Sequence, residues 1–182
     1  MILPMYIFGQ PVLRKEADEI EEDFPNLKEL IENMYETLRR SDGVGLAAPQ
    51  VGLSKRLFIV DLDCLSEDHP EYKGYFKTFI NPEIVEFGTE MSSYEEGCLS
   101  LPGIHENVKR PSRVLLNYLD EEFNEHEEWF DGFPARVIQH EYDHLEGKMF
   151  IDRLGALRKQ MLKSKLAAMA KGKYEASYKC KR

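Results

Sequence analysis

The 182 residues are enough for one domain, and their content of 42% hydrophobic and 11% aromatic residues predicts a buried core. The net charge of −9 argues against a general nucleic-acid-binding protein, and no apolar run approaches the ~20 residues of a membrane span. Residues 1–10 lack the basic and long apolar regions of a secretory signal. We therefore expect a cytoplasmic chain without a membrane partner, in which Cys64, Cys98 and Cys180 do not form a disulfide framework.

The apolar pattern predicts helices and strands in an α+β order. A first helix is expected over residues 24–40, where apolar residues recur at helical spacing. Strands are expected over residues 57–60, 79–87, 92–96, 113–119 and 123–130, and residues 63–77 are expected to form a loop. A buried helix follows over residues 133–146, which Gly147 stops, and then a basic helix over residues 153–170. This order predicts mostly antiparallel sheets packed around the buried helix.

Charge is unevenly distributed along the chain. Residues 153–182 contain ten Lys or Arg and one acid, Glu175, which gives +9. The preceding 152 residues contain 14 basic and 32 acidic residues, which gives −18. The C-terminal segment is either a solvated helix face followed by a frayed end, or a surface that docks on a polyanion.

Residues 140–144 read His-Glu-Tyr-Asp-His, an arrangement that is typical of hydrolytic metal sites. On a helix His140 and His144 lie on one face, so both rings can point at one ion. Glu141 can then reach a water molecule beside that ion and move its protons. The plainer interpretation is a helix that happens to carry two histidines, but Val137 and Ile138 predict burial, and buried histidines need partners.

The third ligand separates the classes of H-E-x-x-H enzyme. One class places a histidine six residues after the second histidine, where this chain has Phe150. Another class uses a downstream acid, and Glu175, in the basic tail, is a poor candidate. Upstream, Cys98 stands in the segment Glu-Gly-Cys-Leu-Ser over residues 96–100, with a turn expected over residues 100–103. A lone cysteine is usually a small buried hydrophobe, so the motif alone leaves Cys98 as a candidate ligand.

Residues 43–50 read Gly-Val-Gly-Leu-Ala-Ala-Pro-Gln. The segment lacks the glycine spacing of a dinucleotide site and the lysine of a phosphate-binding loop. It is either a tight connection of small packed residues or the lip of a substrate groove, where glycines admit a peptide backbone and Gln50 offers an amide donor.

Three segments, residues 43–50, 96–100 and 139–144, occur together and in this order, and the chain thereby resembles the peptide deformylase family. The resemblance extends over residues 3–153 and is weaker beyond them. It implies a single catalytic domain over residues 1–182, of which about 153–182 are the basic helix and tail. It also implies an enzyme that removes the formyl group from the N-terminal formyl-methionine of newly made proteins and releases formate.

The resemblance assigns roles to individual residues. The metal ligands would be Cys98, His140 and His144, with Fe²⁺ as the expected ion and Zn²⁺ or Ni²⁺ as substitutes. Glu141 would be the general base and then the general acid. The other catalytic and substrate-binding residues would be Gln50 and Leu99, which stabilise the charge on the formyl oxygen, and Val44, Gly45, Gly97, Phe133 and Val137, which bind the peptide.

Other positions either fit the resemblance or depart from it. Glu96 and Arg110 occupy positions that pair and brace the cysteine loop. His105 stands where many relatives have arginine, and Arg136 stands where an apolar pocket residue is common, so its stem is expected to cover the methionine while its charge stays in water. The basic C-terminal segment fits a ribosome contact, as in relatives that dock there through a C-terminal helix.

Two other classes remain open from the residues alone. A zinc metallopeptidase of the H-E-x-x-H type would cleave internal peptide bonds and would need a further downstream ligand, against which Phe150 argues. A structural metal site would be closed by four protein ligands, and Cys64 is the only other internal thiol.

Overall fold

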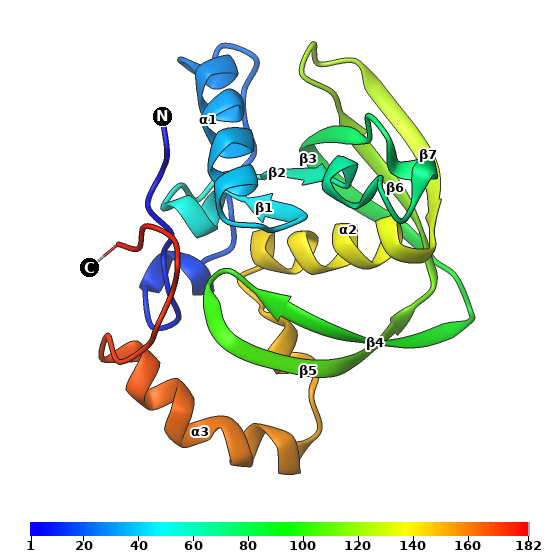
Figure 1. Cartoon of the computed structure of the whole chain (residues 1–182). Coiled ribbons are helices and arrows are strands. Elements are labelled where there is room, and N and C mark those ends of the chain that lie inside the picture. Colours follow the sequence, from blue (N-terminus) through cyan, green and yellow to red (C-terminus); the bar gives the residue numbers. More distant parts are fainter. Residues whose placement is uncertain (182) are drawn as a thin grey trace.

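The structure is a computed structural model that describes residues 1–181, and it has the expected α+β architecture with antiparallel sheets (Figure 1). The helices are α1 (Leu27–Arg40), α2 (Gly132–Leu145) and α3 (Ala156–Ala170), with 3₁₀ turns η1 (Pro11–Arg14), η2 (Ala48–Val51), η3 (Asp63–Leu65), η4 (Pro70–Tyr72) and η5 (Phe150–Arg153). The strands are β1 (Gly45–Ala47), β2 (Leu57–Asp61), β3 (Phe76–Phe87), β4 (Met91–Cys98), β5 (Leu101–Pro111), β6 (Arg113–Leu119) and β7 (Glu125–Asp131).

The strands form two sheets. Five of them pair in the order β1-β2-β3-β6-β7, and β4 pairs with β5 in a separate long hairpin. Every one of these pairings is antiparallel. β2 is buried along its whole length, which explains its unbroken apolar sequence, and β1 lies at the edge of the larger sheet.

Helix α2 lies between the larger sheet and the β4–β5 hairpin (Figure 1). Its apolar side chains Val137, Ile138 and Leu145 pack with Phe58 and Phe79, which stack at 4.7 Å between ring centroids. Ten of its 14 residues are buried. Gly147, with φ of +70°, follows the helix and ends it as the sequence predicted. A helix that is buried on most sides carries its polar side chains into the interior, and this position sets the chemistry of the site.

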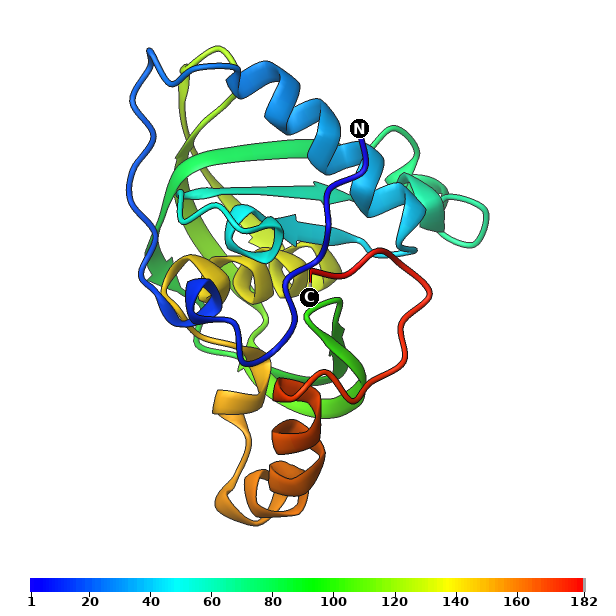
Figure 2. The same ribbon diagram turned by 90° about the vertical axis from the view of Figure 1, so that its left-hand side faces the viewer.

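Helix α3 docks against the outer side of β5. Arg158 pairs with Glu106, and Lys165 Nζ donates to the Gly103 carbonyl at 2.8 Å. The chain after α3 then runs back beside the N-terminal segment, where Met5 N donates to Lys179 O at 2.8 Å (Figure 2). Up to Lys181 this segment is held by hydrogen bonds, so of the two alternatives for the C-terminal segment the frayed end does not fit the described residues. Among residues 1–181, no helix has the length and apolar character that crossing a bilayer requires.

Several element boundaries differ from the prediction. The largest difference is β5, which was not predicted: the turn expected over residues 100–103 lies at Leu99 and Ser100, and Gly103 is inside the strand with φ of +76°. The alternation of buried and exposed positions along β5 is not visible as an alternation of apolar and polar residues, because the charged residue Arg110 occupies a buried position. The short β1 was also missed, since three residues carry too little periodicity to recognise.

Smaller differences occur at the helices and in one loop. Residues 63–77 contain η3 and η4, and β3 begins within this range at Phe76. α1 begins at Leu27 because Asn26 takes a left-handed conformation with φ of 58°. The basic helix begins at Ala156, since η5 occupies the residues before Leu154.

Candidate metal centre

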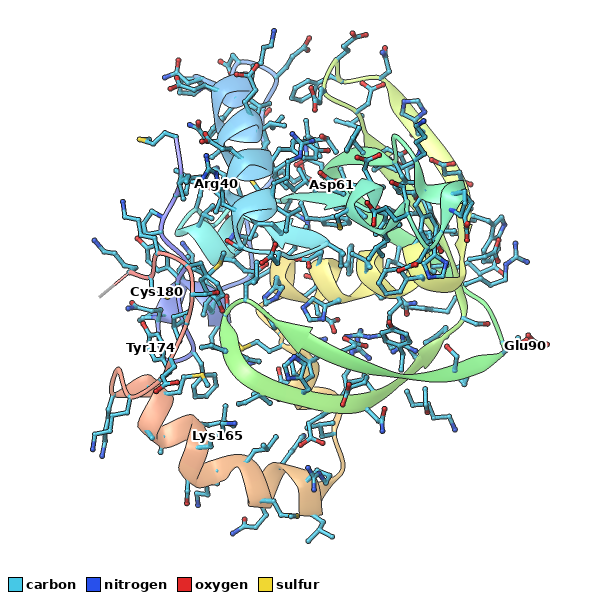
Figure 3. The ribbon with its side chains drawn as sticks, viewed as in Figure 1. Arg40, Asp61, Glu90, Lys165, Tyr174 and Cys180 are labelled. Carbon is cyan, nitrogen blue, oxygen red and sulfur yellow. The ribbon has the colours of Figure 1, made fainter. Side chains whose placement is uncertain are left out.

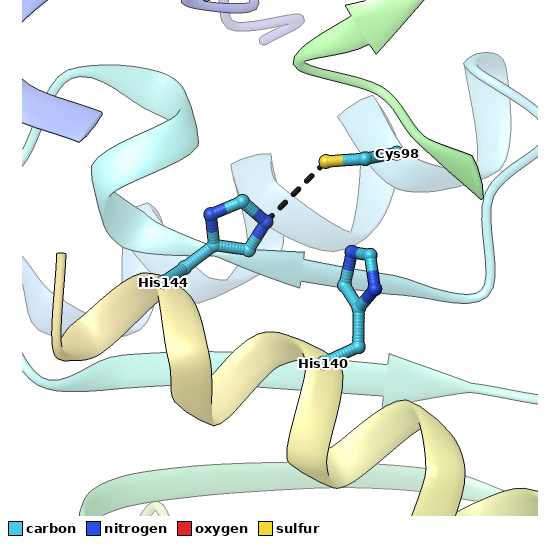
Figure 4. A group of neighbouring side chains, drawn as sticks. All are labelled: Cys98, His140 and His144. Atoms are coloured by element: carbon cyan, nitrogen blue, oxygen red, sulfur yellow. Dashed lines mark hydrogen bonds between the residues drawn. The ribbon is translucent and has the colours of Figure 1, made fainter. Parts of the chain in front are cut away.

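Cys98, His140 and His144 lie together at the junction of α2 and β4 (Figure 4). One ligand atom from each of the three residues lies within 4.8 Å of those of the other two. Cys98 Sγ is 3.3 Å from Nε2 of His144. The four-residue spacing puts both imidazoles on one face of α2, and β4 ends at Cys98 directly opposite that face.

The donor set and its surroundings fit a metal ion. Thiol and imidazole donors suit zinc, iron or nickel. Nδ1 of His140 is hydrogen-bonded to Glu96 Oε1 at 2.8 Å, which leaves Nε2 of that ring for an ion. Burial lowers the pKa of His144 to about 3, so this ring is neutral, as a ligand must be. Within residues 1–181, buried Nδ1 of His144 has no hydrogen-bond partner.

The electrostatic field at this point favours a positive charge. Burial alone lowers the pKa of His140, but hydrogen bonds to Cys98 and Glu96 outweigh burial and raise this pKa well above its ordinary value. The negative groups around the ring therefore attract a cation, which can be a proton or a metal ion.

Glu141 lies beside the cluster and is buried, with 3% of its surface exposed. Its Oε2 has no hydrogen-bond partner among the described residues. Burial raises the pKa of this carboxyl to about 7, so it exchanges a proton near neutral pH. Space for the carboxyl depends on Gly45, because a Cβ at that position would lie 2.7 Å from Glu141 Oε1.

Gln50 aims its amide nitrogen at the cluster. Its Oε1 accepts a hydrogen bond from the Ala47 N–H at 3.0 Å, which orients the amide. Nε2 then lies 3.4 Å from Cys98 Sγ and 3.2 Å from Ser100 Oγ. The donor is thus fixed at the edge of the candidate metal position.

A cavity of about 490 Å³ opens above the cluster. It is lined by most of the site residues that the sequence singled out: Val44, Gly45, Gln50, Gly97, Cys98, Leu99, Phe133, Val137, His140 and Glu141. His144 is not among the lining residues and is buried. Residues 175–178 of the C-terminal segment also line the cavity, which the sequence did not indicate.

Arg136 lines the cavity, so the cover of the methionine by its stem stays a prediction, but the prediction that its charge stays in water is wrong. Its guanidinium is not in water: Nη1 donates to Glu96 Oε2 at 2.7 Å and to the Val108 carbonyl at 2.9 Å. Nη2 donates to the Ser92 carbonyl, also at 2.9 Å. Arg136 therefore joins α2 to the β4–β5 hairpin. The long side chain can reach partners across a protein layer, which sequence spacing does not reveal.

The expected pair of Glu96 and Arg110 is confirmed, and it belongs to a larger buried network. Arg110 is fully buried and donates twice to Glu96, at 2.7 and 2.9 Å, and once to Asp143, at 2.9 Å. Arg153 also donates twice to Asp143, each time at 2.7 Å. Burial tends to raise the pKa of both carboxyls, but these partners, with His140 on Glu96, lower both values.

Asp143 and Arg153 are the members of this network that sequence reasoning missed. Asp143 stands inside the H-E-x-x-H segment, at a position that the motif leaves undefined. A charged residue in a helix with ten buried positions was the available signal, because buried charge needs a partner.

A cluster that could hold a metal ion, beside a carboxyl with a pKa of about 7 and at the floor of a cavity of about 490 Å³, is the arrangement expected of a metal-dependent hydrolase. The model of the polypeptide deformylase family matches residues 2–160. The peptide deformylase of Flavobacterium psychrophilum is 48% identical, covering 100% of this chain and 97% of the relative.

Solved structures agree. The peptide deformylase of Thermotoga maritima has a TM-score of 0.77 at 42% identity, covering 85% of this chain and 99% of that one. A Met-Ala-Ser-bound class I type b peptide deformylase from Acinetobacter baumannii has a TM-score of 0.76 at 38% identity, with the same coverage of both chains. The chain belongs to the polypeptide deformylase family. It is an enzyme that removes the formyl group from nascent peptides, and the zinc peptidase alternative is not favoured.

The buried network generates a stability prediction. Replacing Arg110 with Met leaves the Glu96 and Asp143 carboxylates without their shared cation, so we expect the free energy of unfolding to fall by about 3–5 kcal/mol. Urea-induced unfolding of the metal-free protein measures this change.

The matched control is Arg113→Met, because the Arg113–Asp131 pair has 48% and 70% of its side chains exposed. Its loss is expected to change the free energy by at most about 1 kcal/mol. Equal effects of the two substitutions would contradict a special role for the buried network.

Proposed function

We propose that this chain deformylates nascent peptides with Fe²⁺ held by Cys98, His140 and His144, and with Glu141 as the group that moves protons. The observation that carries this proposal is the convergence of three ligand atoms, within 4.8 Å of one another, beside the buried Glu141 carboxyl, whose Oε2 has no hydrogen-bond partner in the described chain. When bound, the ion supplies Lewis acidity, which activates both a carbonyl group and a water molecule at neutral pH.

Glu141 serves as base and then as acid. Water attacks the formyl carbon, and the carboxylate takes the proton that the water loses. The same carboxyl then gives that proton to the amide nitrogen as the C–N bond breaks, which yields formate and a free methionine amine. The pKa of about 7 supports both halves of this cycle, since neither protonation state is strongly disfavoured at neutral pH.

Gln50 and the Leu99 N–H stabilise the negative charge that develops on the formyl oxygen. The Gln50 amide is already oriented by its bond to the Ala47 N–H, so little reorganisation is needed in the reaction. Leu99 follows the ligand Cys98 directly in the chain and lines the same cavity. A fixed donor at such a position is worth roughly 3–4 kcal/mol of transition-state stabilisation.

The cavity binds the methionine side chain and the peptide backbone. Val44, Phe133 and Val137 supply its apolar wall. The peptide is proposed to lie as an added strand between Gly45, on the edge strand β1, and Gly97, on β4. The Met-Ala-Ser bound by the Acinetobacter relative supports a short peptide that begins with methionine as the ligand of this chain. The ring of His105 lies close to Gly97: a Cβ at Gly97 would lie 2.7 Å from the His105 ring, which narrows the space beside this glycine.

The remaining proposals concern the setting of the enzyme. We propose residues 1–182 as one catalytic domain in the cytoplasm, where nascent formyl-methionine chains are made. The basic helix and tail are proposed to contact the ribosome, supported by the +9 charge of residues 153–182. Arg158 and Lys165 already bind β5, so this contact would use other exposed cations, such as Lys159 and Lys163.

Replacing Glu141 with Gln tests the assignment of the proton-moving group. The amide keeps the shape of the side chain but cannot take up a proton, so formate release from formyl-Met-Ala-Ser is expected to fall by about 10²–10⁴-fold. Metal content and thermal stability are expected to match those of the wild type. A structural metal site would give the same two results but has no activity to lose, so the loss of formate release separates the two classes. The control Glu127→Gln, at an exposed position of β7, should retain full activity. Turnover by the Glu141 variant within tenfold of wild type would refute the assignment.

Anaerobic removal and replacement of the metal tests the proposed ion. Apoprotein reloaded with Fe²⁺ is expected to show the highest rate of formate release, with Ni²⁺ and Zn²⁺ as less active or less oxidation-sensitive substitutes. Metal analysis before each assay fixes the stoichiometry. A rate with Zn²⁺ above that with Fe²⁺ would identify a zinc enzyme instead.

A further inference from the structure

The C-terminal segment forms part of the wall of the catalytic cavity. Residues 175–178 line it together with the metal-binding cluster, although they are far from that cluster in the sequence. The segment also lies beyond residue 160, where the match to the family model ends. The family model therefore does not extend to this part of the cavity wall.

This segment is anchored on both sides of the cavity. Before it, the last turn of α3 contains buried Met169 and packs closely on the N-terminal segment: a Cβ at Gly9, where φ is +102°, would lie 2.8 Å from the Cβ of Ala170. After it, Cys180 forms a parallel β-bridge with Met5. The Met5 N–H donates to the Lys179 carbonyl and the Met5 carbonyl accepts from the Lys181 N–H, each at 2.8 Å. Figure 3 labels Tyr174 and Cys180, which stand in the chain before and after the residues that line the cavity.

Tyr178 makes the contact that reaches the catalytic machinery. Its hydroxyl donates to the Leu99 carbonyl at 2.6 Å. The next carbonyl, that of Ser100, accepts the Phe8 N–H at 2.9 Å. The two-residue turn between β4 and β5 is thus held from outside by one hydrogen bond from each terminal segment.

Fixing the Leu99 carbonyl also fixes the Leu99 N–H. The two groups belong to successive peptide planes that meet at one Cα, so restraint of one plane limits the backbone angles that orient the other. The Leu99 N–H is the backbone donor proposed above for the formyl oxygen. Such a donor is effective only when it is aimed before the reaction at the place where charge develops.

We infer that Tyr178 is a positioning residue for deformylation, which acts by holding the Leu99 peptide group in line with the formyl oxygen. This inference rests on the proposed role of Leu99 and extends the functional site into the C-terminal segment. Tyr178 stabilises the transition state through Leu99 and does not itself transfer protons or bind metal. Its loss therefore affects the chemical step more than the binding of the peptide.

The test compares Tyr178→Phe with Tyr35→Phe in the full chain loaded with metal. Tyr35 is a suitable control because its hydroxyl also makes one partly buried side-chain bond, to Thr78 at 2.9 Å, far from the cavity. With formyl-Met-Ala-Ser, Tyr178→Phe is expected to lower kcat by about tenfold or more and to leave KM within about twofold. Tyr35→Phe is expected to leave both constants unchanged. Metal content and circular dichroism should match wild type in both variants.

A purely structural role predicts a different result. In that case both variants would lose similar thermal stability while kcat stayed at the wild-type value, and the inference would be overturned. A change confined to KM would also overturn it, because peptide contact and not donor alignment would then explain the effect. Wild-type protein that released no formate would instead refute the proposed function on which the inference rests.

Discussion

The buried guanidinium of Arg110 is the constraint on which the arrangement of the site depends. It lies on β5 and binds Glu96 on β4 and Asp143 on α2, so it joins the hairpin that carries the cysteine to the helix that carries both histidines. Glu96 in turn binds Nδ1 of His140 and orients that ring. A charge this deeply buried is costly unless all its partners are in place, which strongly favours a single packing of helix against hairpin.

The catalytic properties of the site follow from the same burial. Because α2 lies between the sheet and the hairpin, Glu141 is taken out of water and its pKa rises to about 7, while His144 stays neutral. Gly45 leaves room for the carboxyl, and the edge position of β1 leaves room for a peptide. The fold thus combines a buried carboxyl, proposed above as the acid–base group, with an open sheet edge, proposed above as the place of the substrate backbone.

The sequence predicted the parts of this account that have local signals. The spacing of His140 and His144 and the glycine after α2 predict a metal-binding helix without tertiary information, and the resemblance added Cys98 as a candidate ligand from a distant segment. The strand β5 and the burial of Arg136 were missed, because charged side chains that pair across layers look like surface residues in a sequence. The contact of Tyr178 with Leu99 was also inaccessible, since Tyr178 stands in a tail without periodicity, 79 positions after Leu99.

The central claim is that Cys98 shares one metal ion with His140 and His144. Titration of the apoprotein with Co²⁺, followed by absorption spectroscopy, tests it most directly, because a cobalt–thiolate bond gives a characteristic sulfur-to-metal charge-transfer band. We predict that this band saturates at one ion per chain and disappears in Cys98→Ser, while Cys64→Ser leaves it unchanged. A band that survives in Cys98→Ser, or that is missing in the wild-type protein, would contradict the account.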